Sequence, residues 1–227
     1  MACIPTVGFF VLAPFMIFAW APSPWGEPAF LSKDALPIPT LINPPPSQGS
    51  SLNQQDYEKL LRYQTTRTDS ECRRANAESP ATFDAFFGAE QGLLTPSEVE
   101  KWAPFFAQLR SDVGFFSFQV KDVWKRPRPY VTDPRIEPCI PKEASSAYPS
   151  AHTAVARVFG LVLSKLDPSR RDAFMRTADR IAEDRILGGV HHPTDVEAGK
   201  KLGDVVYAAL MKSPAFLAAL EQQQFTH

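Results

Sequence analysis

The sequence has little that would point to a polyanionic partner or to a membrane-embedded body. Its 24 Lys and Arg residues against 25 Asp and Glu residues leave a formal net charge of −1. This balance gives no electrostatic argument for an anionic surface, so we expect no nucleic-acid binding. No run of about 18 or more apolar residues occurs after the N-terminal segment, which argues against a polytopic membrane domain.

Cysteine is also scarce, with three residues in the chain. Cys3 lies within the apolar N-terminal segment, which leaves Cys72 and Cys139 as a single pair. In an exported protein we expect these two to form a disulfide, and a loop of this length gives a chain-entropy stabilisation of roughly 4 kcal/mol. Two unrelated buried thiols are the alternative for a cytosolic protein.

The uncharged N-terminal run, residues 4–21, ends in Ala19, Trp20 and Ala21, which is the small-x-small pattern of a signal-peptide cleavage site. We therefore predict that residues 1–21 are a signal peptide and that the mature protein is periplasmic or secreted. The first residues carry no Lys or Arg, and Pro22 would directly follow the cut. An uncleaved membrane anchor is therefore the alternative.

Two regions of different composition follow. Residues 22–51 are dense in Pro, Ser and Gly, including Pro44, Pro45 and Pro46, and are predicted to form an extended arm. In residues 52–227 turn signals separate stretches of helical period, and no alternating strand pattern is visible. The predicted fold class is all-α, a single-domain helical bundle.

The clearest helix start is at Thr95, with Pro96 in the first helical position and Glu98 closing a capping box. Pro104 should kink or restart this helix. Apolar residues recur behind the start at spacings of three and four, which predicts one buried face: Val99, Trp102, Phe106, Leu109, Val113, Phe116, Val120 and Trp124.

Further helices are expected after three other signals. Asp167 and Pro168 read as an N-cap and a first helical position, and another helix should start near Pro193. The segment from His152 to Leu166 also has the character of a helix.

Three short clusters hold nearly all the residues that a phosphate-handling site requires. They are KDVWKRPRP with Lys121 and Arg128, YPSAH with His152, and RILGGVHHPTD with Arg185 and His191. Each is a weak signal by itself, because a Lys and an Arg seven apart are usually a solvated helix face. A Ser and a His two apart are usually incidental.

In this order and spacing the clusters resemble the three-part signature of the phosphatidic acid phosphatase type 2 and vanadium haloperoxidase superfamily. The segment LINPPPSQGS, the following helix with Tyr57, and the HPTDVEAG stretch are similar to class A bacterial nonspecific acid phosphatases. The resemblance spans roughly residues 40–210. It implies a metal-independent acid phosphatase that hydrolyses phosphomonoesters through a phosphohistidine. Whether phosphotransfer to alcohols competes with hydrolysis is left open.

The chemistry can also be followed from the residue types. Phosphoryl transfer needs cations around the equatorial oxygens, a nucleophile in line with the leaving oxygen, and an acid that protonates it. Guanidinium forks suit bidentate phosphate contacts, and backbone amides at a helix start favour an anion. We expect no metal and no cofactor, and the predicted phosphate-binding residues are Lys121, Arg128, Ser150, Ala151, His152 and Arg185.

The predicted catalytic residues are His191 as nucleophile, His152 as general acid, and Asp195 as the group that holds the tautomer of His191. The interval from Arg185 selects His191 over its neighbour, because five residues before the histidine and three after it match the family pattern. His192 is then expected to pack beside the following proline. One histidine must be protonated while the other is neutral, and an acidic pH optimum is a reasonable consequence.

Two positions depart from the family pattern. Ala151 stands where the family usually has Gly, and Asp184 stands where Ser usually precedes the arginine. If position 151 needed a positive φ, its Cβ would cost on the order of 1 kcal/mol. Asp184 could either weaken phosphate binding or point away from the site.

Several alternatives are open at this stage. Within the superfamily they are a lipid-phosphate or diphosphate phosphatase and a vanadate-dependent haloperoxidase, and outside enzymes a phosphate-binding pseudoenzyme. A metal site from His152, His191, His192 and Asp195 is a further alternative, which the neighbouring cations disfavour. The sequence does not identify the natural small-molecule phosphomonoester. It also leaves the oligomeric state open, and a homo-oligomer is one of the options.

Overall fold

The structure is a computed structural model that describes residues 25–37, 40–88 and 91–223. Within these ranges the regular secondary structure is helical and no strand is present, so the all-α prediction is confirmed. The predicted signal peptide or anchor, residues 1–21, lies outside the described residues. The helices are α1 (Ser51–Thr66), α2 (Asp69–Ala77), α3 (Phe83–Phe87), α4 (Pro96–Trp124), α5 (Pro129–Thr132), α6 (Ala151–Leu166), η2 (Pro168–Arg170), α7 (Arg171–Leu187), α8 (Pro193–Leu210) and α9 (Pro214–Glu221).

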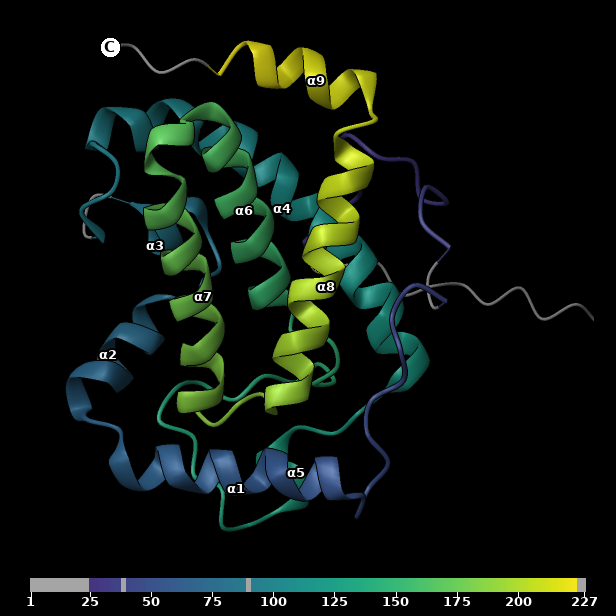
Figure 1. The fold of residues 1–227 in the computed structure, drawn as a ribbon, viewed down its shortest axis with the longest axis vertical. Helices are drawn as coiled ribbons and strands as arrows, with labels where there is room; N and C mark the ends of the chain where they lie inside the picture. Colours follow the sequence, from purple (N-terminus) through teal and green to yellow (C-terminus); the bar gives the residue numbers. More distant parts are fainter. Residues whose placement is uncertain (1–24, 38–39, 89–90, 224–227) are drawn as a thin grey trace, which may run out of the picture.

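Helix α6 is the centre of the bundle. It packs against α7, α8 and α4, and most of its side chains are buried. Figure 1 shows α6, α7 and α8 side by side, with α1 crossing one end of the group and α9 crossing the other. The end crossed by α1 contains the first residues of α6 and α8 and the last residues of α7. The second and third sequence clusters are therefore carried to the same end of the bundle.

Two glycines of α8 allow this helix to approach α6 closely. A Cβ at Gly199 would lie 2.5 Å from the backbone oxygen of Ser150, and one at Gly203 would lie 2.8 Å from the Cβ of Arg157. The backbone N–H of Ser150 also donates to the carbonyl oxygen of Asp195 at 2.9 Å. These contacts fix the start of α6 against the start of α8, which is where the histidines lie.

Helix α4 begins as its sequence predicts. The Thr95 hydroxyl accepts from the backbone N–H of Glu98, whose carboxylate accepts from the N–H of Thr95, and Pro96 occupies the first turn. The predicted apolar face is buried from Val99 to Val120. The helix is not restarted at Pro104, because residues 96–124 form a single helix that includes it.

The other predicted helix starts are close to those observed. Asp167 caps a short 3₁₀ turn, Pro168–Arg170, and the α-helix begins only at Arg171. Helix α8 begins at Pro193 as expected.

Among the described residues, no single helix has the length and apolarity needed to cross a membrane. Helices α8 and α9 reach that length and composition only when they are counted together, across a bend of 87°.

The part of the proline-rich arm that the structure describes, residues 25–37 and 40–50, has no helix or strand and lies against the bundle. The buried carboxylate of Asp112 in α4 accepts the backbone N–H groups of Ala29, Phe30 and Leu31 at 2.8–3.2 Å. The ring of Phe30 also packs on those of Phe105 and Phe216. Three backbone N–H groups of the arm, which would be paired within a helix or a sheet, are thus paired with the side chain of Asp112 instead.

Candidate active site

Three buried cations meet at the end of the bundle that α1 crosses. Lys121 and Arg185 lie in the last turns of α4 and α7, and Arg128 directly precedes α5. Their exposed fractions are 3%, 1% and 2%, respectively. Burial, followed by the charge of Arg128, lowers the pKa of Lys121 to about 7, and burial also lowers the pKa of Arg185. The structure therefore brings the three predicted cations together, and burial disfavours the charged forms of Lys121 and Arg185.

The carboxylate of Glu143 joins two of these cations, and this residue is not among those predicted for the site. Arg128 Nη2 donates to its Oε2 at 2.7 Å, and Arg185 Nη2 donates to its Oε1 at 2.5 Å. Burial alone would raise the pKa of Glu143, but His152, Arg128 and Arg185 together lower it far below its usual value. The residue lies in the irregular segment between α5 and α6, where no periodic pattern marks it. It therefore stays ionised beside the cations.

His191 points one ring nitrogen at the cations and the other at a carboxylate. Arg128 Nη1 lies 2.8 Å from His191 Nε2, and Asp195 Oδ2 lies 3.4 Å from His191 Nδ1. Because a guanidinium can only donate, Nε2 must accept and the proton of the neutral ring must be on Nδ1. Burial, then the charge of Arg128, lowers the pKa of His191 well below its usual value. The ring is therefore neutral, with its lone pair directed at the cation cluster.

A third arginine, Arg126, which is not among the predicted site residues, supports Asp195 through its other carboxylate oxygen. Arg126 donates to Asp195 Oδ1 at 2.6 Å and to Asp56 Oδ2 at 2.9 Å, and all three side chains are buried. The backbone N–H of Thr194 donates to Asp56 at 3.0 Å, which ties α1 to the start of α8. Burial alone would raise the pKa of Asp195. The hydrogen bonds with the two adjacent histidines and the charge of Arg126 instead lower it well below its usual value.

His192 shares Asp195, but its other ring nitrogen faces a tyrosine. Its Nδ1 lies 3.0 Å from Asp195 Oδ2, and its backbone N–H donates to the same oxygen at 2.8 Å. Its Nε2 lies 3.4 Å from the hydroxyl of Tyr57, and the two rings meet edge to face. The contact with Asp195 therefore does not distinguish the two histidines, whereas the direction of Nε2 does.

His152, in the first turn of α6, is held by a backbone carbonyl. Its Nε2 lies 2.9 Å from the oxygen of Ser79, and since a carbonyl can only accept, Nε2 carries a proton. Its Nδ1 faces Glu143 Oε1 at 3.9 Å. Burial, followed by the charge of Arg185, lowers the pKa of His152 to about 3. A phosphate anion beside the ring would favour the protonated form, in which Nδ1 could act as an acid.

Ser150 and Ala151 form the start of α6. The buried Ser150 is the N-cap, and its hydroxyl oxygen accepts from the backbone N–H and the hydroxyl of Thr153. Ala151 is helical and is not among the residues with positive φ, so its Cβ carries no backbone strain. The cost of about 1 kcal/mol that a positive φ at position 151 would carry therefore does not apply.

Asp184 points away from the cation cluster. Its carboxylate takes two hydrogen bonds from Arg74 of α2, at 2.7 and 2.8 Å, and one from Arg180 at 3.1 Å. The residue is 2% exposed and links α2 to α7. The sequence left open whether Asp184 weakens phosphate binding or points away from the site, and the structure supports the second alternative.

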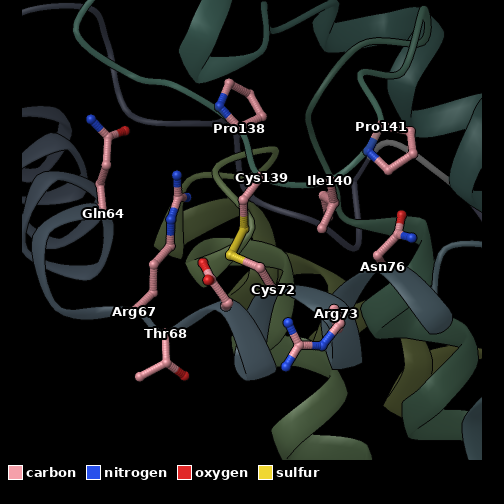
Figure 2. A pocket seen from close by; sticks show the side chains of 11 residues that line it. Gln64, Arg67, Thr68, Cys72, Arg73, Asn76, Pro138, Cys139, Ile140 and Pro141 are labelled. Carbon is pink, nitrogen blue, oxygen red and sulfur yellow. A yellow bond between two sulfur atoms is a disulfide. The ribbon is translucent and has the colours of Figure 1, made fainter.

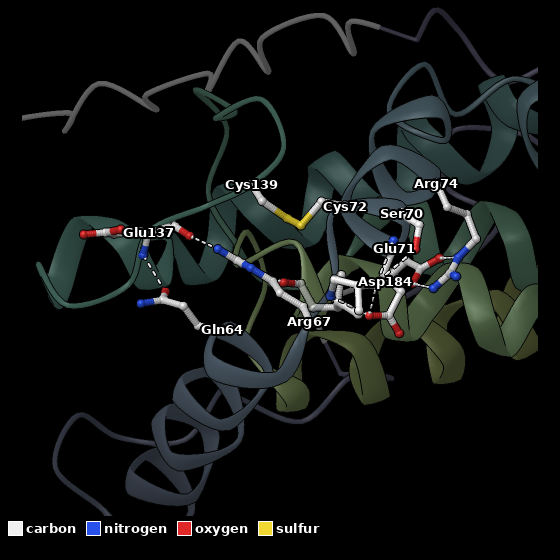
Figure 3. The surroundings of a disulfide bond; sticks show 11 residues. Gln64, Arg67, Ser70, Glu71, Cys72, Arg74, Glu137, Cys139 and Asp184 are labelled. Carbon is white, nitrogen blue, oxygen red and sulfur yellow. Dashed lines mark hydrogen bonds and ion pairs between the residues drawn. A yellow bond between two sulfur atoms is a disulfide. The ribbon is translucent and has the colours of Figure 1, made fainter.

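Cys72 and Cys139 form a disulfide with a Cα–Cα distance of 5.8 Å. It joins α2 to the segment that leads to Glu143, and Figure 3 shows further ties beside it. Arg67 donates to the carbonyl oxygen of Glu137 at 2.6 Å, and the backbone N–H of Glu137 donates to Gln64 at 2.7 Å. The segment before the site is therefore fastened to α1 and α2.

Two surface pockets formed by described residues do not include the cation cluster. One of about 790 Å³ lies beside the disulfide (Figure 2), and one of about 440 Å³ lies against Tyr57 and His192. Within residues 25–37, 40–88 and 91–223, no group of three His, Cys, Asp or Glu side chains is arranged to hold a metal ion.

Comparison with known proteins shows which family this chain resembles. The model of the PAP2 superfamily matches residues 105–217. A non-specific acid phosphatase of Providencia stuartii is 27% identical over 193 residues, covering 80% of this chain and 77% of the relative. A non-specific acid phosphatase of Salmonella typhi is 24% identical over 221 residues, covering 91% and 86%. The resemblance inferred from the three clusters is confirmed.

Two solved structures share the fold. A bacterial vanadium-dependent iodoperoxidase superposes with a TM-score of 0.56 at 15% identity, and this chain is covered to 76% but spans only about half, 52%, of that chain. A transmembrane PAP2-type phosphatidylglycerolphosphate phosphatase from Bacillus subtilis superposes with a TM-score of 0.52 at 15% identity, covering 79% of this chain and 91% of that one. At 15% sequence identity, these two similarities show only that the fold is shared.

Proposed function

We propose that this chain is a member of the PAP2 superfamily and an acid phosphatase that hydrolyses phosphomonoesters without a metal ion, through a phosphohistidine at His191. The observation that carries the proposal is the direction of His191 Nε2, whose lone pair faces Arg128 at 2.8 Å while Nδ1 faces Asp195. A phosphate held by the cations would lie in front of that lone pair.

The steps follow from the groups already placed. His191 Nε2 attacks phosphorus, the bond to the ester oxygen breaks, and protonated His152 gives its Nδ1 proton to the leaving alkoxide. Neutral His152 then accepts a proton from the water that attacks the phosphohistidine, which releases inorganic phosphate and frees His191. Lys121, Arg128 and Arg185 neutralise the equatorial oxygens, and Asp195 stabilises the positive charge on the His191 ring.

The disulfide and the N-terminal sequence support an exported, periplasmic or secreted, enzyme. The acid phosphatase names of the relatives support a small phosphomonoester as substrate. A haloperoxidase would use the same cations for vanadate, and it is the activity to be tested beside phosphatase activity.

The test combines a chemical and a mutational arm. Hydrolysis of p-nitrophenyl phosphate should survive EDTA and should be inhibited by orthovanadate, with no bromide or iodide oxidation by the vanadate-loaded protein. His191→Ala should abolish turnover, whereas the matched His192→Phe variant should keep much of it. Rapid acid-free quenching should trap an acid-labile phosphohistidine at position 191. A label on His192, or activity that is lost to EDTA and restored by a divalent ion, would refute the proposal.

A further inference from the structure

The carboxylate of Glu143 lies where a phosphate group would have to bind, an inference that rests on the proposed function. It takes one hydrogen bond from Arg128 and one from Arg185, at 2.7 and 2.5 Å, and lies 3.9 Å from His152 Nδ1. These three side chains are the ones that the proposed mechanism assigns to phosphate oxygens and to the leaving group. A carboxylate and a phosphate present the same kind of acceptor to an arginine fork.

Glu143 is also the member of this cluster that solvent reaches. Its side chain is 28% exposed, whereas those of Arg128 and Arg185 are 2% and 1% exposed. The Nε and Nη1 atoms of Arg185 have no hydrogen-bond partner among the described residues. The carboxylate thus stands between solvent and the cations, and Arg185 has buried donors beyond the one that Glu143 uses.

The backbone of Glu143 is held in place independently of its side chain. The hydroxyl of Tyr130 donates to the carbonyl oxygen of Glu143 at 2.8 Å and accepts from its backbone N–H at 3.0 Å. Glu143 can therefore leave the arginines by rotation about its side-chain bonds, with no movement of the segment. Because the backbone stays in place, the carboxylate is within reach of the arginines again once the anion has left.

We propose that Glu143 is a built-in competitor for phosphate, which sets the affinity of the site for phosphate anions by occupying Arg128 and Arg185 until a substrate displaces it. A phosphate that takes the donors held by Glu143 must displace the carboxylate, because two anions cannot share the same donors without strong repulsion. The apparent Kd is then the intrinsic one divided by the fraction of molecules in which the carboxylate is displaced. The binding of substrate and the binding of inorganic phosphate are weakened alike, and the release of the phosphate product is favoured.

The test measures inorganic phosphate binding to the whole protein by isothermal titration calorimetry. Glu143→Gln removes the charge and retains the shape, and hydrogen bonds to charged groups are strong enough that phosphate affinity should rise at least about tenfold. Glu137→Gln is the matched control, because this exposed glutamate lies on the same segment and uses only its backbone in the contacts described above. Its phosphate affinity should equal that of the wild type.

The melting temperature gives a second readout. Without phosphate, Glu143→Gln should melt below the wild type, because the cations lose their counter-charge. Added phosphate should raise its melting temperature more than that of the wild type. Should this variant not fold, Glu143→Asp shortens the reach to both arginines by one methylene and should also bind phosphate more tightly.

The possible outcomes separate this inference from the proposed function. Unchanged or weaker phosphate binding in the Glu143 variants, with active wild type, overturns the inference and leaves the phosphatase proposal intact. A lower kcat without tighter phosphate binding would show instead that Glu143 positions His152. If the wild type neither binds phosphate nor hydrolyses p-nitrophenyl phosphate, both are overturned.

Discussion

Replacing Lys121 by Arg should extend the activity of this enzyme to higher pH. Lys121 is 3% exposed, and burial together with the charges of Arg128 and Arg185 lowers its pKa from 10.5 to about 7. Its ammonium donates to the carbonyl oxygen of Ser146 at 2.5 Å, so it is held beside the cluster in one orientation. A guanidinium in its place would remain charged throughout the accessible pH range.

The size of the effect follows from the pKa. The charged fraction of a group with a pKa of about 7 falls roughly tenfold between pH 6 and 8 and tenfold again by pH 9. If phosphate binds only when this lysine is charged, kcat/KM of the wild type should fall by the same factors, because this ratio reports the free enzyme. In Lys121→Arg, the part of the decrease in kcat/KM at high pH that comes from Lys121 should be absent. Any part that comes from His152 should remain.

Unfolding linked to the titration of Lys121 would not cause this decrease in activity at high pH. The pKa of Lys121 is lower in the folded protein than in the unfolded chain, so unfolding takes up a proton between about pH 7 and 10.5. Stability contributed by this group therefore rises with pH in that window, while activity should fall. A melting temperature recorded at each pH separates the two causes.

The assay is kcat/KM for p-nitrophenyl phosphate from about pH 4 to pH 9, with the wild type and Lys121→Arg compared in the same buffers. The reasoning fails if the wild-type ratio is flat to about pH 9, or if both proteins lose activity over the same interval by the same factor. A variant that is inactive at every pH while its melting temperature is unchanged would show that the shape of the lysine, and not its charge, is what the site requires.

Two further predictions concern stability. Reduction of the Cys72–Cys139 disulfide should lower the free energy of unfolding by about 4 kcal/mol, measured by chemical denaturation with and without reductant, and two free thiols in the unfolded, unreduced mature protein would contradict it. Arg126→Ala should cost about 3–5 kcal/mol because it leaves two buried carboxylates unpaired, whereas Arg135→Ala, at a side chain 68% exposed, should cost less than about 1 kcal/mol. Equal losses of unfolding free energy in these two variants would show that the buried pairs add nothing.

Much of the fold could be predicted because it is encoded locally. The capping box at Thr95 and the helix start at Pro193 depend on residues within one turn of each other, and both were predicted correctly. Pro104 shows the limit of local rules. A proline inside a helix removes one hydrogen bond, but the buried aromatic face on either side, which includes Trp102 and Phe106, holds α4 in one piece.

The candidate site could be predicted only where residue type and spacing carry information. The cations and histidines stand at intervals that a family shares, and the structure brings Arg128, Arg185, His152 and His191 around the carboxylate of one residue. That residue, Glu143, has no such signal, because it follows Lys142 in an irregular segment and its neighbours have no periodic pattern.

Arg126 was missed for a related physical reason. It stands two residues before Arg128, and nothing in the sequence says which of two nearby arginines will face the phosphate and which will be buried behind a carboxylate. The choice depends on Asp56, seventy positions earlier in α1, whose oxygens accept from both Arg126 and Thr194. A charge that is balanced by a distant partner becomes visible only when the chain is folded, and so the order of cations around the site follows from the packing of α1 across the start of α8.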